Sequence, residues 1–171
     1  MNAISFNGTL AGISKIMNSD FNKFHKTVNN SKFLNIKKWA SFPLNKIIDN
    51  KSKIYNISGI YVIENIDIEI LYVGKAKSIY GRLYSHYKAT LGNEKASAWK
   101  QFFEYFNSNL IAYYFITTGY SKEYEEIIRQ ALEKIIQIKY RPLFDRIYSR
   151  KGHNEISNFG EVVNLLKNNA R

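Results

Sequence analysis

The chain has 171 residues and carries 25 Lys and Arg against 14 Asp and Glu, which gives a formal net charge of +11 at pH 7. This excess favours a polyanionic partner, nucleic acid ahead of an anionic membrane, although many basic proteins bind no polyanion. The chain has no cysteine, which excludes disulfides, thiolate zinc sites and cysteine nucleophiles. No stretch approaches the ~20 consecutive apolar residues of a membrane span, and the first residues lack a signal-peptide pattern. We therefore expect a soluble, cytoplasmic protein with no membrane partner.

Hydrophobic residues make up 45% of the chain and aromatic residues 15%, which is enough for one folded domain with a real core. The positive charge is concentrated near the N-terminus, because residues 1–58 hold nine Lys and only two acids. We divide the chain into a basic, mostly helical N-terminal extension (1–57), a main domain (58–150) and a tail with a short helix (151–171).

The first elements in chain order are weak helices followed by a hairpin. Residues 4–30 have an irregular helical pattern, and residues 31–40 and 44–49 are expected to form short helices or turns. Residues 59–64 and 69–73 are rich in apolar and β-branched side chains, which predicts two antiparallel strands joined by a turn.

Helices and one more strand follow. Ser78 is a good N-cap for a helix that ends near residue 89. A second helix is expected over 95–106, and its aromatic side chains are predicted to form core rather than a base-stacking platform. A strand at 110–117 precedes the longest helix, 121–140, whose predicted buried stripe is Ile127, Ile128, Ala131, Leu132, Ile135 and Ile138. This order predicts an α+β fold with a three-stranded antiparallel sheet flanked by helices.

Two Gly/Tyr triplets lie in the predicted hairpin, Gly59-Ile60-Tyr61 and Tyr72-Val73-Gly74. If the turn sets the register, the two tyrosines lie close together on one face, and Gly74 permits a bend closed to larger residues. Arg82 and His86 are four residues apart on the next helix, so they share a face. A phenol, a guanidinium and an imidazole at the end of a hairpin are typical of a site that handles a phosphate.

At these residues the sequence resembles the GIY-YIG nuclease family. The first triplet is GIY itself, the second has Val in place of Ile, and the segment GKAKSIYGRLYSH (74–86) is similar to the family's segment after YIG. A second similarity lies in ALEKIIQIKYRPLFD (131–145), which resembles the family's Glu-bearing helix and the proline that follows it. Together the matches cover about half the chain, residues 59–146.

The resemblance implies hydrolysis of DNA phosphodiester bonds with one Mg²⁺ or Mn²⁺ per active site. It makes Tyr61 the base or positioning group for the attacking water, and His86 the group that tunes or deprotonates this phenol. Tyr72 would bind or orient the scissile phosphate, and Arg82 would stabilise the charge of the transition state. Glu133 would hold the metal, since a carboxylate suits a hard divalent ion that keeps most of its waters.

Further basic residues are candidate DNA contacts. Gly74, Lys75 and Lys77 follow the second triplet, where the lysines are expected beside the phosphate backbone. Lys37 and Lys38, in NIKKW (35–39), form either a DNA-contacting arm or, nearly as plausibly, a solvated charge pair.

Asp145 stands where many family members have Asn. Its carboxylate could add a metal ligand or repel the phosphate, but a tolerated substitution at a structural position is favoured. The other site residues also have ordinary interpretations. Tyr61 and Tyr72 could be common strand tyrosines, and Arg82 and His86 a solvated helix face. Glu133 lies opposite the predicted apolar stripe, as both a site carboxylate and an exposed residue would.

Among family roles, a compact restriction-type endonuclease is favoured, because only about 20 residues follow the main domain (58–150) and a basic extension suits DNA wrapping. One active site cuts one strand, so a double-strand break needs a homodimer or two binding events. The alternatives are a non-catalytic nucleic-acid-binding module on the same fold, a repair nuclease and an RNA-directed nuclease.

Overall fold

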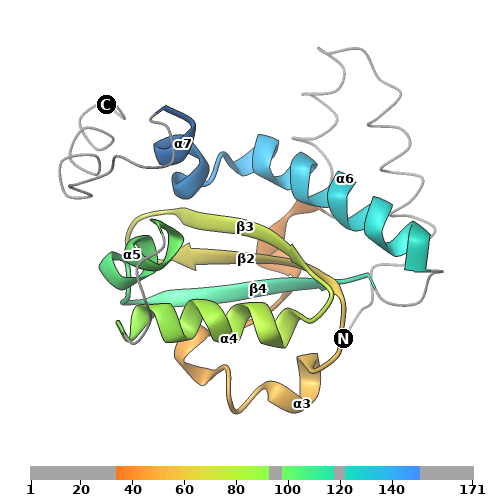
Figure 1. The fold of residues 1–171 in the computed structure, drawn as a ribbon, viewed down its shortest axis with the longest axis horizontal. Helices are drawn as coiled ribbons and strands as arrows, with labels where there is room; N and C mark the ends of the chain where they lie inside the picture. The colour runs from red at the N-terminus through yellow and green to blue at the C-terminus, as the bar shows by residue number, and fades with distance from the viewer. Residues whose placement is uncertain (1–33, 93–97, 118–121, 151–171) are drawn as a thin grey trace.

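The computed structural model describes residues 34–92, 98–117 and 122–150, which surround a four-stranded antiparallel sheet (Figure 1). The strand order is β1-β4-β2-β3, with β1 at Ala40–Pro43, β2 at Gly59–Asn65, β3 at Ile70–Ala76 and β4 at Leu110–Ile116. The expected mixed fold is confirmed, but the prediction of three strands is wrong. The fourth strand, β1, lies mainly between the two segments predicted to be short helices or turns, 31–40 and 44–49, and pairs with β4.

The β2–β3 hairpin confirms both predicted strands, and β3 continues to Ala76. Its turn begins at Asn65, whose side-chain oxygen accepts a 3.0 Å hydrogen bond from the backbone N–H of Asp67. This local bond favours a tight reversal of the chain. The register places Tyr61 opposite Gly74 and Ile63 opposite Tyr72, with an irregularity at Ile63/Glu64.

Helices cover both faces of the sheet. On one face lie α4 (Ile79–Thr90) and α5 (Ala98–Tyr105), and on the other lies α6 (Lys122–Tyr140). The predicted cap of α4 is confirmed, because Ser78 Oγ accepts a 3.2 Å hydrogen bond from the N–H of Gly81. The aromatic side chains of α5 are core as predicted, and the buried ones are Phe102, Phe103 and Phe106.

The apolar stripe of α6 differs from the predicted one. Ile127 is 55% exposed, whereas the buried apolar side chains are Ile128, Leu132, Ile135 and Ile136, which pack on Ile60, Val62 and Val73 of the sheet. At about 100° per residue, this rotation moves Glu133 from the predicted far side of the helix to its flank. The flank is beside β3, and Glu133 is therefore half-buried there.

The helix ends at Tyr140, as the following Pro142 predicts. Arg141 adopts a φ of 47°, which reverses the chain into α7 (Leu143–Arg150), a helix that the sequence did not predict. In Figure 1 α7 lies beside β3, where Arg146 forms an ion pair with Glu69. Within the described residues no helix is both long and apolar enough to cross a membrane.

The described part of the N-terminal extension packs on the domain. It forms the short helices η2 (Ile36–Lys38), η3 (Leu44–Lys46) and α3 (Lys51–Ile54). Leu34 and Ile36 are fully buried beneath α6, and Tyr140 Oη donates a 2.7 Å hydrogen bond to the Leu34 carbonyl. The helical pattern at 4–30, the first residue of the helix predicted at 121–140 and the tail with its short helix (151–171) lie outside the described residues.

Candidate active site

The hairpin delivers both motif tyrosines to the α4 face of the sheet. Because Tyr61 is paired with Gly74 and Tyr72 lies two residues away on β3, the rings are diagonal neighbours. They stack with centroids 6.0 Å apart and an interplanar angle of 24°. The expected proximity of the two phenols is confirmed.

The two motif glycines leave room for neighbouring groups. A Cβ atom on Gly59 would overlap the carbonyl oxygen of Phe115 on β4 and the tip of Ile79. A Cβ atom on Gly74 would lie 2.5 Å from Tyr61 Oη and 2.8 Å from Tyr72 Cε1. Gly74 therefore does not form the predicted bend. It is a paired strand residue whose missing side chain makes space for the Tyr61 phenol.

His86 projects from α4 onto these tyrosines and is 5% exposed. Its Nε2 atom lies 2.9 Å from Tyr61 Oη, and its ring lies 4.5 Å from Phe103 and 5.2 Å from Trp99 between centroids. Burial, helped by the charge of Arg82, lowers the pKa of His86 to about 3. Burial also raises the pKa of Tyr61 well above its usual 10. Both groups are therefore neutral at pH 7, with the phenol and the imidazole hydrogen-bonded to each other.

Arg82 and Glu133 approach the pair from two different helices. Arg82 is exposed and forms no ion pair with a described residue, and its charge lowers the pKa of Tyr61 against the effect of burial. Glu133 Oε1 accepts a 3.1 Å hydrogen bond from the backbone N–H of Lys75, directly after the second triplet. Burial raises the pKa of Glu133, Lys75 opposes this, and the nearby Asp145 carboxylate adds to it. The predicted phenol, imidazole, guanidinium and carboxylate thus lie in one region.

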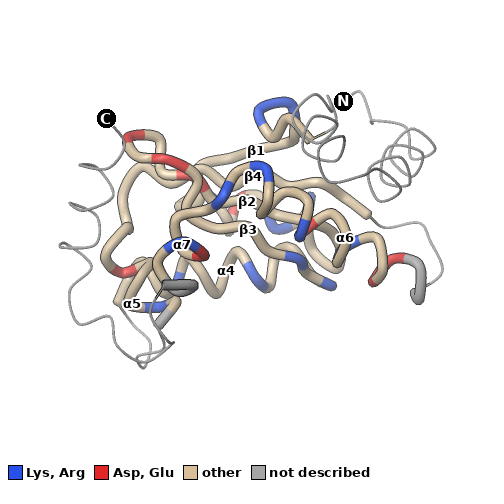
Figure 2. Tube along the Cα trace, turned by 90° about the horizontal axis from the view of Figure 1, so that it is seen from above, with Lys and Arg blue, Asp and Glu red and all other residues tan. Residues whose placement is uncertain are grey.

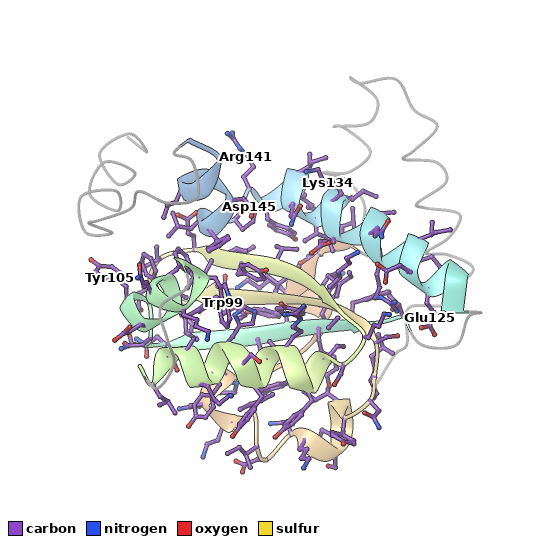
Figure 3. The ribbon with its side chains drawn as sticks, in the orientation of Figure 1. Trp99, Tyr105, Glu125, Lys134, Arg141 and Asp145 are labelled. Atoms are coloured by element: carbon purple, nitrogen blue, oxygen red, sulfur yellow. The ribbon has the colours of Figure 1, made fainter. Side chains whose placement is uncertain are left out.

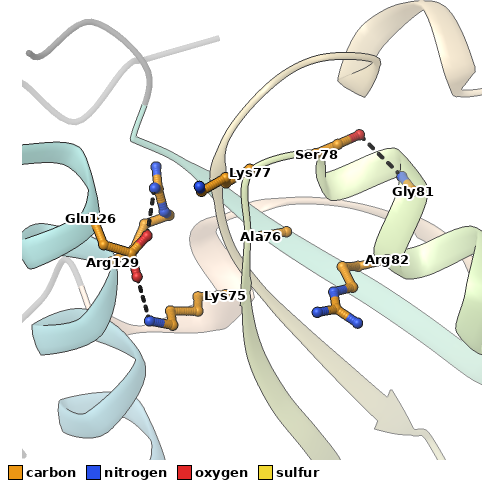
Figure 4. A pocket seen from close by; sticks show the side chains of 8 residues that line it. All are labelled: Lys75, Ala76, Lys77, Ser78, Gly81, Arg82, Glu126 and Arg129. Atoms are coloured by element: carbon orange, nitrogen blue, oxygen red, sulfur yellow. Dashed lines mark hydrogen bonds and ion pairs between the residues drawn. The ribbon is translucent and has the colours of Figure 1, made fainter. Parts of the chain in front are cut away.

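A pocket of about 410 Å³ adjoins this region between the start of α4 and α6 (Figure 4). Lys75, Lys77 and Arg82 contribute positive charge to its wall, and on the α6 side Lys75 Nζ lies 2.6 Å from Glu126 Oε1. Arg129, only 3% exposed, donates to Glu126 at 2.8 Å. The sequence reasoning missed Glu126 and Arg129, although their spacing of three residues on a helix predicts an ion pair.

The two lysines predicted as an arm lie elsewhere. Lys37 Nζ contacts Glu64 Oε1 at 2.6 Å and Tyr113 Oη at 3.0 Å, and Tyr113 belongs to the core on the α6 side of the sheet. Lys37 is therefore engaged on the opposite face from Tyr61. Lys38 is exposed and pairs with no described acid. Their contact with DNA stays a prediction.

A family model described as the GIY-YIG catalytic domain matches residues 57–147, more than half of the chain. The chain belongs to the GIY-YIG family. Neither the curated proteins nor the solved structures compared with it include a match. GIY-YIG proteins form a nuclease family, and its nucleases generally depend on a divalent metal.

The GIY-YIG match ends within α7, the helix that carries the residue departing from the family pattern. Asp145 is half-buried, and in Figure 3 it lies on α7 above the β3 side of the sheet. Burial raises its own pKa, and its charge raises the pKa of Tyr72 as well as that of Glu133. Its neighbour Phe144 packs on Tyr72 with ring centroids 5.3 Å apart. Asp145 therefore contributes to the negative potential around Glu133.

Proposed function

We propose that this GIY-YIG protein is a divalent-metal-dependent DNA endonuclease that hydrolyses phosphodiester bonds. The observation that carries the proposal is the 2.9 Å contact between Tyr61 Oη and His86 Nε2, with Arg82 and Glu133 in the same region. A module that only binds DNA needs exposed lysines and arginines. A buried phenol–imidazole pair beside a carboxylate contributes nothing to such binding. It is an arrangement that transfers protons.

Tyr61 is the proposed acceptor of the proton from the attacking water. The neutral imidazole of His86 accepts the phenol hydrogen bond at Nε2 when its ring hydrogen is on Nδ1, an atom with no partner among the described residues. Because burial raises the pKa of Tyr61, little phenolate forms at pH 7. The charge of Arg82 favours the phenolate. Once the phenol has lost its proton to solvent, the phenolate oxygen takes a proton from the attacking water. The resulting hydroxide attacks phosphorus, and the bond from phosphorus to the leaving oxygen of the phosphodiester breaks.

Tyr72 and Arg82 are the proposed phosphate ligands. Burial and the nearby acids raise the pKa of Tyr72, so its hydroxyl remains protonated and can donate to a phosphate oxygen. Arg82 has no carboxylate partner among the described residues, so its guanidinium is available for two phosphate oxygens. Lys77, exposed at the rim of the adjoining pocket, would contact a neighbouring phosphate.

The residues around Glu133 fit a hard divalent cation that keeps most of its waters. In the described ranges no group of three or more His, Asp or Glu side chains could hold a metal. Mg²⁺ commonly uses one or two carboxylates together with water and substrate phosphate, and Glu133 supplies such a carboxylate. Asp145 raises the pKa of Glu133, and a cation would relieve this repulsion. A bound Mg²⁺ or Mn²⁺ would supply positive charge to the phosphate and the leaving oxygen.

The specific role we propose is that of a restriction-type enzyme. The excess of lysine in residues 1–58 adds positive charge next to the nuclease domain, which favours binding to duplex DNA. A double-strand break then requires a homodimer or two successive binding events.

A plasmid-nicking assay with Mg²⁺ or Mn²⁺ tests the proposal. Glu133→Gln and Arg82→Ala should abolish cleavage, whereas Glu104→Gln, which alters an exposed carboxylate on α5, should cleave like the wild type. Discrete products would support sequence specificity, and a smear would refute the restriction role. Thermal stabilisation by Mn²⁺ that is lost only in Glu133→Gln would support the metal ligand independently of activity. Wild-type binding to DNA without cleavage in either metal would favour the non-catalytic module.

A further inference from the structure

A continuous row of tyrosines lies on the surface formed by α3 and α4. Tyr55 contacts Tyr80 edge to face with ring centroids 6.0 Å apart. Tyr80 stacks on Tyr84 at 5.6 Å with an interplanar angle of 9°, and Tyr84 contacts Tyr87 at 6.4 Å. We refer to these four residues as the tyrosine row. It begins at an open end, because Tyr55 is 53% exposed while the others are half-buried.

Lysines accompany the row along its length. Lys51 Nζ lies 5.3 Å from the ring centroid of Tyr55 and 5.6 Å from that of Tyr80, and Lys88 Nζ lies 5.6 Å from that of Tyr84. A cation over an aromatic face near the surface is held by only about 0.5–1 kcal/mol. The segments Lys51–Ile54 and Ile79–Thr90 contain no acid, and their four charged side chains are all cationic. In Figure 2 basic segments lie along α4. The two segments that carry the row are therefore aromatic, and all their charged side chains are positive.

The tyrosine row differs from the other aromatic stripe of the domain. Phe102, Phe103 and Phe106 of α5 are buried in the core and are closed to any ligand. The tyrosines of the row instead pack on the same core only in part and keep their outer sides in solvent. Aromatic rings interleaved with lysines are the arrangement on which unpaired nucleotides bind, with bases on the rings and phosphates on the cations.

We propose that the tyrosine row binds single-stranded DNA, as a second site outside the active site, and that Tyr55 stacks on a base. Paired bases do not offer their faces to a protein, so the row selects the unpaired part of a substrate. Lys51 and Lys88 neutralise its phosphates. This inference rests on the proposed function in one respect, namely that the substrate of the domain is DNA.

Helix geometry connects the row to the active site. Arg82 lies two residues after Tyr80 and two residues before Tyr84. At about 100° per residue, its side chain therefore projects from the flank of α4 opposite the tyrosine row. At the level of Arg82 the solvent side of the helix between the two flanks carries the small residues Gly81 and Ser85, and Lys88 shares this side about one turn beyond Ser85. A strand can therefore cross the helix, about 10 Å wide, between Arg82 and the row without meeting a large side chain. The row would bind the unpaired nucleotides that flank the phosphate bound by Arg82.

The test is fluorescence anisotropy of a labelled oligothymidine of about 12 nucleotides, with the full chain in EDTA so that no cleavage occurs. Tyr55→Ala should weaken binding about 5- to 100-fold, and Tyr55→Trp should restore it. The matched control is Tyr105→Ala, because Tyr105 is 52% exposed on α5 and lies outside the row. Lys51→Gln should lower the slope of log affinity against log salt by about 0.7.

Several outcomes would overturn the inference: equal losses in Tyr55→Ala and Tyr105→Ala, no loss in Tyr55→Ala, or tighter binding of the matching RNA or duplex DNA through Tyr55. Tyr84→Ala provides a second variant, and thermal melting establishes that each variant is folded. The two proposals fail separately. If the wild type nicks plasmid and Tyr55→Ala binds the oligonucleotide normally, the proposed nuclease activity stands and the proposed single-stranded DNA site is refuted. If the wild type does not nick plasmid but its binding of the oligonucleotide depends on Tyr55, the single-stranded DNA site stands and the nuclease activity is refuted.

Discussion

Replacing Gly74 by alanine should damage both the stability and the activity of the domain. The new Cβ atom would lie 2.5 Å from Tyr61 Oη and 2.8 Å from Tyr72 Cε1, so both phenols would have to move. Overpacking of this kind costs about 1–3 kcal/mol. Loss of the Tyr61–His86 hydrogen bond adds about 1 kcal/mol. We therefore expect the free energy of unfolding to fall by about 2–4 kcal/mol. Nicking should fall about 100-fold, as expected for a displacement of about 1 Å at a reacting group.

Gly81→Ala is the control for stability, since a Cβ atom on Gly81 would have no neighbour closer than 3.4 Å. Removing a glycine from α4 should leave the free energy of unfolding unchanged or raise it by up to about 1 kcal/mol. Urea unfolding at pH 7 measures both variants, and the nicking rate of Gly74→Ala is measured below its unfolding range. If Gly74→Ala were as stable and as active as the wild type, the explanation of this glycine by the Tyr61 phenol would be wrong.

Three further predictions concern charge and protonation. If phenolate Tyr61 is the base, its raised pKa predicts nicking that accelerates about tenfold per pH unit between pH 7 and 9. A nicking rate that is constant over this range would refute phenolate as the base. The pKa of His86 is lower in the folded chain (about 3) than unfolded (6.5), so its contribution to stability is complete above pH 6.5 and is lost as the pH falls toward 3. From pH 7 to 4 the wild type should lose about 3 kcal/mol more than His86→Leu in urea unfolding, and parallel losses would contradict the buried neutral imidazole. Arg129→Met should lower the free energy of unfolding by about 3–5 kcal/mol, because it leaves the partly buried Glu125 without this partner. The control Lys134→Met, at an exposed residue, should change the free energy of unfolding by less than about 0.5 kcal/mol. Thermal melting measures both variants.

The central part of the site could be predicted because its signals are local in sequence. The hairpin follows from two apolar β-branched runs around a turn, and Ser78 marks the start of α4, so Tyr61, Tyr72, Arg82 and His86 fall on known sides of known elements. The family resemblance assigned roles to these residues. The reason for Gly74 could not be predicted, because it depends on where the phenol of a neighbouring strand points.

Features that depend on distant contacts were missed or misjudged. The four residues of β1 have no alternating pattern and include a proline, and they become a strand only through pairing with β4. Helix α6 has isoleucines on more than one side, so composition does not decide that Ile136 is buried and Ile127 is exposed. The packing of α6 on the sheet determines the rotation of the helix, and this rotation places Glu133 beside β3.

Strand β1 also determines how the protein can be shortened. The family match begins at residue 57, so a fragment cut to its limits would lack β1 and leave β4 unpaired along one side. The exposed edge would be LIAYYFI, seven uncharged residues of high β-propensity, which is the kind of segment that recruits further chains into aggregates. In the intact protein the edge belongs instead to a four-residue strand that ends in Pro43, a poor template for further pairing. Truncations meant to remove the basic N-terminus should therefore end before Leu34, and insolubility of the minimal fragment would say nothing about its catalytic residues.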